Sequence, residues 1–452
     1  MKKPQSAPEL HDLLNRRAMD LHVAFSDVRY QNLARESQLS YRHWNKLRRI
    51  ARDRELDPEL AWISVKFGRL SGMRSVPLLA TGSTQVIYTV PDRLQHEIML
   101  IDQHLAGQIG TEGPMRMGAE KDRFIASALM EEAIASSMLE GAATTVVAAK
   151  EMLRTGRRPR TMGERMVANN YRAMEFIRDN LERRLSPDLL LELHHVLTDD
   201  TLDKPDQSGR FRLPSEYVVV TDQRDGELVH EPPPADELPN RIERLCAFAN
   251  EQTLSDEGGF IHPFIRAALL HFQIGYDHPF CDGNGRTARM IFYWSMLRAG
   301  YWLFEFLPIS RLIYKSPGKY GQAYLYTETD GFDATYFLVY HARIVQQARE
   351  DLREHLVRSQ QEIAEARELF KRDQDLNHRQ HELLMHAVQH PDTIYTIEGH
   401  QRSQRVAYAT ARSDLLTLVD RKYFSMHKSG SRLEFVAEKK VVALRGRLRR
   451  SR

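Results

Sequence analysis

The stretch from His278 to Arg289 reads His-Pro-Phe-Cys-Asp-Gly-Asn-Gly-Arg-Thr-Ala-Arg. A histidine can accept a proton from a hydroxyl near neutral pH, and a carboxylate four residues later can hold a hard divalent cation that phosphates already bridge. Glycines let backbone N–H groups approach an anion, and arginines give forked donors for phosphate oxygens. The apolar run 290–297 predicts a buried helix whose N-terminus points at the same anion.

This stretch resembles the signature of the Fic family, His-x-Phe-x-(Asp/Glu)-Gly-Asn-Gly-Arg-x-x-Arg, at every fixed position. A polar loop that only caps a core helix has no need of all these groups together. Family members transfer a nucleotide monophosphate, most often AMP from ATP, to a protein hydroxyl. The resemblance implies that His278 is the catalytic base and that Asp282 holds Mg²⁺. It also assigns nucleotide binding to Asp282, Gly283, Asn284, Gly285, Arg286 and Arg289.

Two segments before the signature are also similar to the family. Apolar residues in 262–272 recur at helical spacing, which predicts the helix that leads into the signature loop. The runs 216–221 and 228–230, separated by Asp225-Gly226, predict a β-hairpin. In the family this hairpin is a flap whose backbone pairs with the target, so a target protein is expected to dock near Val218–Thr221. The alternative is a surface hairpin without a role.

A second motif stands inside the predicted helix 124–139. Ser136, Glu140 and Gly141 match the family's inhibitory motif, (Ser/Thr)-x-x-x-Glu-(Gly/Asn), and they precede the catalytic core, as in the class with an N-terminal inhibitory helix. The resemblance implies that Glu140 pairs with Arg289 and places an acid where phosphate charge should go. An exposed helical glutamate is the plainer alternative.

An aromatic residue lies near the nucleotide in many family members, and Tyr320 stands at the corresponding place. Three further tyrosines, Tyr314, Tyr324 and Tyr326, compete for this role.

Composition is ordinary for a soluble globular chain, with 28% charged and 42% hydrophobic residues among 452. The formal net charge of +3 says little about partners. The two cysteines, Cys246 and Cys281, offer neither a disulfide framework nor a zinc site. We expect a cytoplasmic protein without a membrane span, because no apolar run approaches the required length and the N-terminus lacks a signal-peptide core.

The predicted fold is mainly α: a Fic-type helical core with a β-hairpin flap, followed by a C-terminal winged helix. The predicted parts are an N-terminal mixed region (1–105), the core with its inhibitory helix (106–355), a charged helical connector (356–375), the winged-helix-like domain (376–437) and a basic tail (438–452). Shorter patterns predict helices at 41–45, 61–65 and 334–340, and an extended segment at 84–88.

The C-terminal part is interpreted from its order of elements. A helix at 379–388, a second helical run at 406–418 and two short strands, 423–426 and 432–435, resemble a winged helix. Such a module would place Arg402, Arg405 and Arg412 near a DNA backbone or a protein surface. The alternative is a stabilising or dimerising appendage, because a fold alone does not give a function.

We therefore predict an autoinhibited protein adenylyltransferase that uses ATP and Mg²⁺ on a Ser, Thr or Tyr hydroxyl of a target or of itself. One rival is a hydrolase that removes AMP, with Glu140 positioning a water. Another is a DNA-binding regulator whose Fic core is a sensor. A homodimer and DNA are further candidate partners.

Overall fold

The computed structural model describes residues 3–106, 119–222, 226–251, 254–255, 259–371, 375–389, 393–429, 432–439 and 441. The chain divides into two compact units, Met1–Arg349 and Glu350–Arg452. As predicted, the fold is mainly helical, and the strands form small antiparallel sheets.

The first unit begins with a group of helices that share one apolar cluster around Trp62 and Leu33. They are α1 (Leu10–Arg16), α2 (Leu21–Ser26), α3 (Val28–Ser40), α4 (Trp44–Asp53) and α5 (Pro58–Leu70). The predicted helix at 41–45 is wrong at its start. Tyr41 ends α3 in the left-handed conformation (φ 45°), and the His43 ring accepts a hydrogen bond from the Asn45 amide to begin α4.

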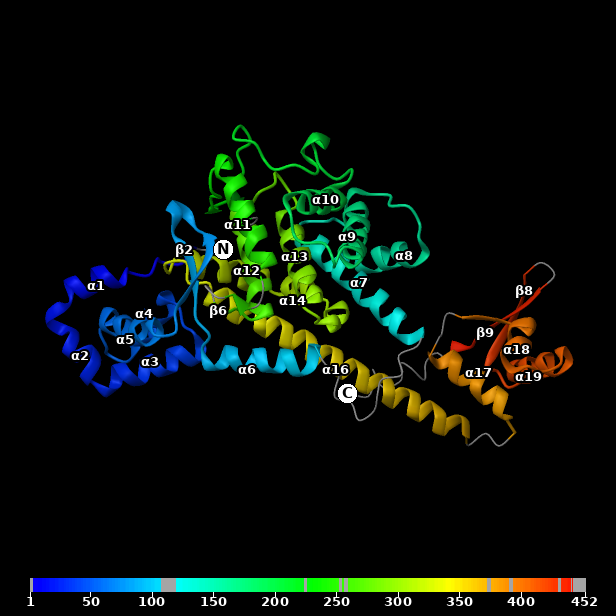
Figure 1. The fold of residues 1–452 in the computed structure, drawn as a ribbon. Coiled ribbons are helices and arrows are strands. Elements are labelled where there is room, and N and C mark those ends of the chain that lie inside the picture. Colours follow the sequence, from blue (N-terminus) through cyan, green and yellow to red (C-terminus); the bar gives the residue numbers. More distant parts are fainter. Residues whose placement is uncertain are drawn as a thin grey trace. The chain divides into compact units, whose positions relative to one another are not determined.

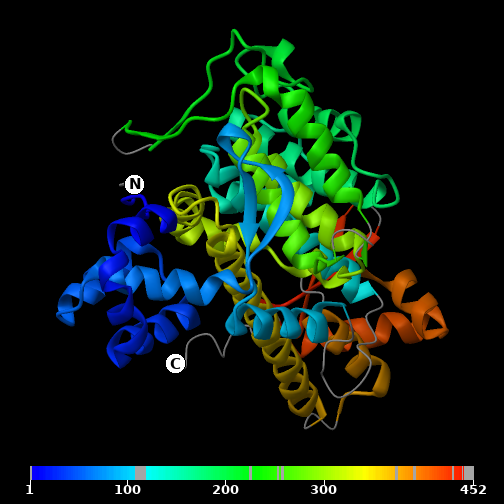
Figure 2. The same ribbon diagram turned by 60° about the vertical axis from the view of Figure 1, so that its left-hand side comes forward.

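A hairpin of β1 (Arg74–Leu79) and β2 (Gln85–Tyr88) follows, then α6 (Asp92–Ile101), so the predicted extended segment at 84–88 is present. Figure 2 shows this hairpin against the helices of the core. The Arg241 side chain on α11 (Leu238–Asn250) donates to the Leu79 carbonyl at the end of β1, which joins the hairpin to the core.

The core is built around α12 (Pro263–Asp277) and α13 (Asn284–Arg298), which pack against each other near its centre (Figure 1). Nearly every residue of both helices is buried, and the buried set includes polar side chains such as Arg286 and Arg289 that are hydrogen-bonded inside the core. The surrounding helices are α7 (Ala119–Leu139), α8 (Val146–Thr155), α9 (Met162–Asp179), α10 (Pro187–Thr198), α14 (Ile309–Lys315) and α15 (Pro317–Glu328).

The flap consists of β3 (Val220–Thr221) and β4 (Leu228–His230), an antiparallel pair shorter than the predicted strands. Its first strand is short because Glu216 folds back, accepting hydrogen bonds from the Leu213 amide (2.7 Å) and the Arg210 guanidinium (2.7 Å). Asp225 in the predicted turn lies outside the described residues. Another small pair joins β5 (Leu254–Ser255) to β6 (Gly259–Phe260).

The predicted helix at 334–340 and the charged connector after it form a single helix, α16 (Thr335–Lys371). No glycine or proline interrupts this stretch, so the break expected between the two segments has no physical cause.

The second unit continues α16 and adds α17 (His378–Gln389), β7 (Ile394–Thr396), α18 (Ile397–Gln404), α19 (Tyr408–Asp420), β8 (Phe424–Ser429) and β9 (Arg432–Ala437). The strands form an antiparallel sheet in the order β7-β9-β8, and Leu384, Leu415 and Phe435 lie in the buried core. Most of the basic tail lies outside the described residues. In the described part of the chain, no helix is both long and apolar enough to cross a membrane.

Candidate active site

His278 ends helix α12 in a backbone conformation that is rare for a residue with a Cβ (φ 43°, ψ 59°). Its Nδ1–H donates to the Gly275 carbonyl, so Nε2 is the nitrogen that carries a lone pair. Burial lowers the pKa of the imidazole to about 4. The ring is therefore neutral at pH 7 and can accept a proton.

The next turn of chain places the N-terminus of α13 beside this histidine. Gly283 takes a positive φ of 82° and the helix begins at Asn284. The Asn284 side chain bonds both the amide (2.9 Å) and the carbonyl (2.8 Å) of Phe280, which closes the loop. Because the first amides of a helix have no partner within it, this end can bind an anion.

His194, on α10, contacts the signature loop, and the sequence did not indicate this role. Its Nε2–H donates to the Asp282 carbonyl (2.9 Å), its Nδ1 accepts from the Gly209 amide (3.0 Å), and its ring stacks on Phe280 at 3.7 Å. Burial lowers the pKa of His194 to about 4, so the neutral tautomer with Nε2–H is maintained.

Asp282 and Arg286 lie on the same side of the loop. The Asp282 side chain is 58% exposed, and its Oδ1 accepts from the Gly283 amide (2.6 Å). Arg286 is fully buried, donates to the Leu197 carbonyl (3.1 Å) and lies 3.4 Å from Asp282 Oδ2. Of the residues predicted to bind nucleotide, Gly285 and Tyr320 line the cavity at this site. The others are not among its lining residues: Asp282, Gly283, Asn284, Arg286 and Arg289.

Two of the three residues of the second motif, Ser136 and Glu140, contact the signature. Arg289, fully buried, donates through Nε to Ser136 Oγ (2.9 Å) and through Nη2 to Glu140 Oε1 (2.9 Å). The Glu140 carboxylate also packs so closely on Gly285 that a Cβ there would collide with it. Gly141 has a φ of 89°, which allows the chain to turn after α7. A carboxylate thus occupies the N-terminus of α13.

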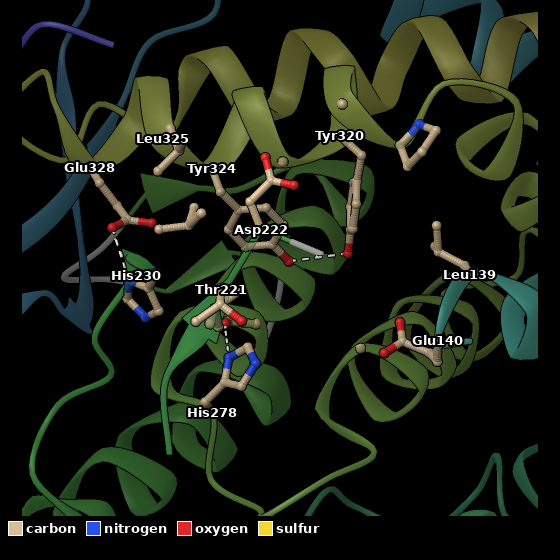
Figure 3. A pocket seen from close by; sticks show the side chains of 17 residues that line it. Leu139, Glu140, Thr221, Asp222, His230, His278, Tyr320, Tyr324, Leu325 and Glu328 are labelled. Atoms are coloured by element: carbon tan, nitrogen blue, oxygen red, sulfur yellow. Dashed lines mark hydrogen bonds and ion pairs between the residues drawn. The ribbon is translucent and has the colours of Figure 1, made fainter. Parts of the chain in front are cut away.

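A cavity of about 470 Å³ is lined by His278, Glu140 and Gly285 together with residues of the flap and of α15 (Figure 3). Figure 3 shows Leu139 and Glu140 on one side of the cavity and His230 and Glu328 on the other, with Thr221 and Asp222 between them; Val220 also lines the cavity. The remaining lining residues are Val229, Gly275, Pro317, Gly318, Tyr320, Gly321, Tyr324 and Leu325.

Tyr320 and Tyr324 line the cavity, whereas Tyr314 and Tyr326 do not. A chain of hydrogen bonds fixes the orientation of Tyr320. His341 Nδ1–H faces the Phe337 carbonyl (3.3 Å), so its Nε2 accepts from His271 Nδ1–H (3.0 Å). His271 Nε2 must then accept from the Tyr320 hydroxyl (2.7 Å).

Two further lining residues, His230 and Glu328, were not predicted. His230, at the end of β4, places Nδ1 2.9 Å from Glu328 Oε2 and Nε2 2.7 Å from the Tyr276 carbonyl. The pair is separated by 98 residues, and no motif marks either member.

The chemistry around Asp282 fits a magnesium ion bound mainly through substrate phosphates. An exposed carboxylate beside a helix N-terminus supplies one protein oxygen ligand, which suits an ion that keeps water and phosphate ligands. Among the described residues, no cluster of three or more His, Cys, Asp or Glu side chains could hold a metal without such a substrate.

Comparison with known proteins finds a matching family and similar chains. Residues 184–296 match the model of the Fic/DOC family. Protein adenylyltransferase Fic from Nematostella vectensis is 28% identical over 187 residues, which cover 40% of this chain and 40% of that protein. The protein of the same name from Drosophila grimshawi is 33% identical over 131 residues, covering 28% of this chain and 24% of the relative. The chain thus spans well under two thirds of these relatives.

A solved structure shows the same fold. The crystal structure of a Fic family protein from Desulfovibrio desulfuricans G20 superposes with a TM-score of 0.50 at 20% identity, over 77% of this chain and 97% of that one. This chain therefore contains a region similar to the Fic/DOC family, and it is similar to proteins named protein adenylyltransferase Fic.

Proposed function

We propose that this chain is a protein adenylyltransferase that moves AMP from ATP to a Ser, Thr or Tyr hydroxyl, and that Glu140 holds it inactive. One observation carries the proposal: a neutral histidine, an anion-binding helix N-terminus and a carboxylate that occupies this N-terminus all border one cavity. The relatives named protein adenylyltransferase Fic support the assignment of the reaction.

The reaction follows from the placement of the protein groups. The target hydroxyl attacks the α-phosphate, His278 Nε2 takes its proton, and pyrophosphate leaves. The first amides of α13, including that of Gly285, hold the phosphate oxygens. Asp282 would hold Mg²⁺, which neutralises phosphate charge when bound.

The flap supports a protein as the acceptor. In the described residues β3 pairs only with β4, so its other edge is open to an extended segment of a target. Thr221 on this strand borders the same cavity as His278, so a segment paired with β3 would present its side chain there (Figure 3). A segment of the chain itself is also a candidate acceptor.

Inhibition follows from a competition for the same donors. A guanidinium that bonds Glu140 cannot bond a γ-phosphate in the same orientation, and the carboxylate repels phosphate from the helix N-terminus.

The proposal is tested with radiolabelled ATP, a cell lysate and four proteins: wild type, Glu140→Gly, Glu140→Gly with His278→Ala, and Glu131→Gln as a control on the preceding helix α7. We expect labelled bands with Glu140→Gly that His278→Ala removes. Mass spectrometry identifies the modified residue. Equal labelling by all four proteins would contradict the proposal.

Removal of AMP is the second candidate, because Glu140 lies 26% exposed at the cavity and could orient a water. Two assays distinguish the reactions. If the protein is a hydrolase, release of AMP from an AMP-modified substrate should fall in Glu140→Gly. If it is an inhibited transferase, transfer of AMP from ATP should rise in the same variant.

For the C-terminal unit we propose a winged helix. The order helix, strand, two helices and hairpin supports it, as does the sheet order β7-β9-β8. Exposed Arg402, Arg405 and Arg412 on and beside α18 and α19 support duplex DNA as a partner. A gel shift with the triple Arg→Ala variant tests this.

A further inference from the structure

His230 links three separate elements at the edge of the cavity. It ends the flap strand β4, its Nε2 lies 2.7 Å from the carbonyl of Tyr276 on α12, and its Nδ1 lies 2.9 Å from Glu328 at the end of α15. The Tyr276 carbonyl is two residues before His278, and the rings of His230 and His278 are 6.1 Å apart. The side chains of His230 and Glu328 are only 8% and 14% exposed.

Hydrogen-bond chemistry restricts the charge of this histidine. A carbonyl oxygen only accepts, so Nε2 must carry a hydrogen. A carboxylate oxygen also accepts, so Nδ1 carries a second hydrogen whenever Glu328 is ionised. Two N–H groups on one imidazole make it a cation.

We infer that His230 is a positioning residue for the proposed transfer: as a cation paired with Glu328, it fixes the flap against the Tyr276 carbonyl and so aligns the target hydroxyl with His278. The inference rests on the proposed function and assigns to this pair a role in target presentation.

The charges around His230 support the cation. Burial, the largest single effect, lowers the pKa of His230, but the hydrogen bond and charge of Glu328, the hydrogen bond to the Tyr276 carbonyl and the charge of Asp277 together outweigh it, so the pKa is raised. In return, after burial, the positive charge of His230 is the next largest cause of the low pKa of His278. The pair therefore also keeps the base in its neutral form.

The anchoring of the flap explains why the pair would affect turnover more than nucleotide binding. Glu140, Gly285 and Arg289, at the proposed phosphate site, are not among the hydrogen-bond partners of His230. The flap strand, in contrast, is bonded through His230 to the corner that ends in His278. Loss of this bond would let the flap shift relative to the base, and displacements of about 1 Å can cost a large factor in rate.

The test uses the full chain in the Glu140→Gly background, with His230→Gln and Glu328→Gln as variants. Glutamine at 230 retains a donor for the Tyr276 carbonyl but carries no charge. We expect kcat to fall about tenfold while KM for ATP changes less than about twofold, because both variants lose the ion pair that holds the flap, whereas the phosphate site is unchanged. In His230→Gln the acid limb of the kcat profile should move to higher pH, because His278 loses a neighbouring positive charge.

Matched controls are His262→Gln and Glu305→Gln. His262 pairs with Asp102 and Glu305 with Arg178, and neither residue lines the cavity. Both controls should keep the kcat and the acid limb of the Glu140→Gly parent. Thermal unfolding is measured for every variant, so that a general loss of stability is recognised.

A second readout does not need activity. In NMR spectra of protein with ¹⁵N-labelled histidine, the signal that His230→Gln removes should show two protonated nitrogens at pH 7, and its titration midpoint should fall in Glu328→Gln. A neutral His230 at pH 7 overturns the inference, as does an unchanged kcat and acid limb in His230→Gln. If Glu140→Gly itself shows no transfer, the proposed function fails, and the NMR titration still decides whether the charged pair exists.

Discussion

Replacing Glu140 with glycine should raise the rate of AMP transfer strongly, and the contacts of Glu140 set the size of the effect. The carboxylate accepts one hydrogen bond from a fully buried guanidinium and lies on the N-terminus of α13. A hydrogen bond to a charged group contributes about 1.5–3 kcal/mol, and a carboxylate at a helix N-terminus adds about 0.3–1 kcal/mol. Together these two contributions favour the arrangement in which Glu140 bonds Arg289 by about 2–4 kcal/mol. Their loss should raise the fraction of molecules with an unoccupied α13 N-terminus by about 30- to 700-fold.

The assay is the initial rate of transfer from labelled ATP, with wild type, Glu140→Gly, Glu140→Gln and Glu131→Gln compared at saturating Mg²⁺. Glu131 lies on α7, the helix that precedes Glu140, and pairs with Lys150 outside the cavity, so its neutral variant should match the wild type. Glu140→Gln should be intermediate, because it keeps the shape and loses the charge. Arg289→Ala in the Glu140→Gly background should lose the gain, since coupled residues are not additive. An equal or lower rate in Glu140→Gly refutes the competition.

Three further outcomes follow from the site. In the Glu140→Gly background, His278→Ala should lower the rate of transfer by about two to four powers of ten. Because the pKa of His278 is lowered to about 4, the transfer rate of the Glu140→Gly parent should stay level from pH 7 down to about 5 and fall only as the imidazole gains a proton. A rate that already falls at pH 6.5 would contradict a neutral base. Asp282→Ala should raise the Mg²⁺ concentration for half-maximal ATP binding by about tenfold, with Asp12→Ala as control; calorimetry measures this, and an unchanged metal dependence would remove Asp282 as a ligand. Gly285→Ala should destabilise the wild type by about 1–3 kcal/mol in denaturant unfolding, because the new methyl meets Glu140, and much less in Glu140→Gly; equal losses in both backgrounds would show that the two residues do not touch.

The signature could be predicted in detail because its groups are local in sequence. His278, Asp282 and Gly283 are placed by one helix end and one helix start, and both ends carry signals in the chain: Pro263 at the start of α12 and the glycine at the start of α13. The pairing of Glu140 with Arg289 was also predicted, although 149 residues separate them, because a second motif resembled the family's inhibitory pattern.

What the sequence did not predict depends on single long-range contacts. Nothing near His194 indicates that its ring will stack on Phe280, and nothing near Glu328 indicates His230. The shortened β3 depends on Glu216, whose carboxylate captures Arg210 and the Leu213 amide and so holds the approach to the flap as a loop. Alternating apolar residues alone cannot reveal such side-chain competition for the backbone.

The anchoring of α7 indicates how the proposed inhibition would be relieved. The helix is held on two sides, since Asn170 on α9 donates to the Ala133 carbonyl (3.2 Å) and buried Glu132 accepts from the Ser310 amide (2.8 Å). Withdrawing the whole helix would break these buried contacts together with its apolar packing. Glu140 stands just beyond the end of α7, its side chain is 26% exposed, and its carboxylate accepts a hydrogen bond from Arg289. Rotation of this one side chain therefore costs less than movement of the helix, so a signal that activates transfer needs only to give the Glu140 carboxylate another partner.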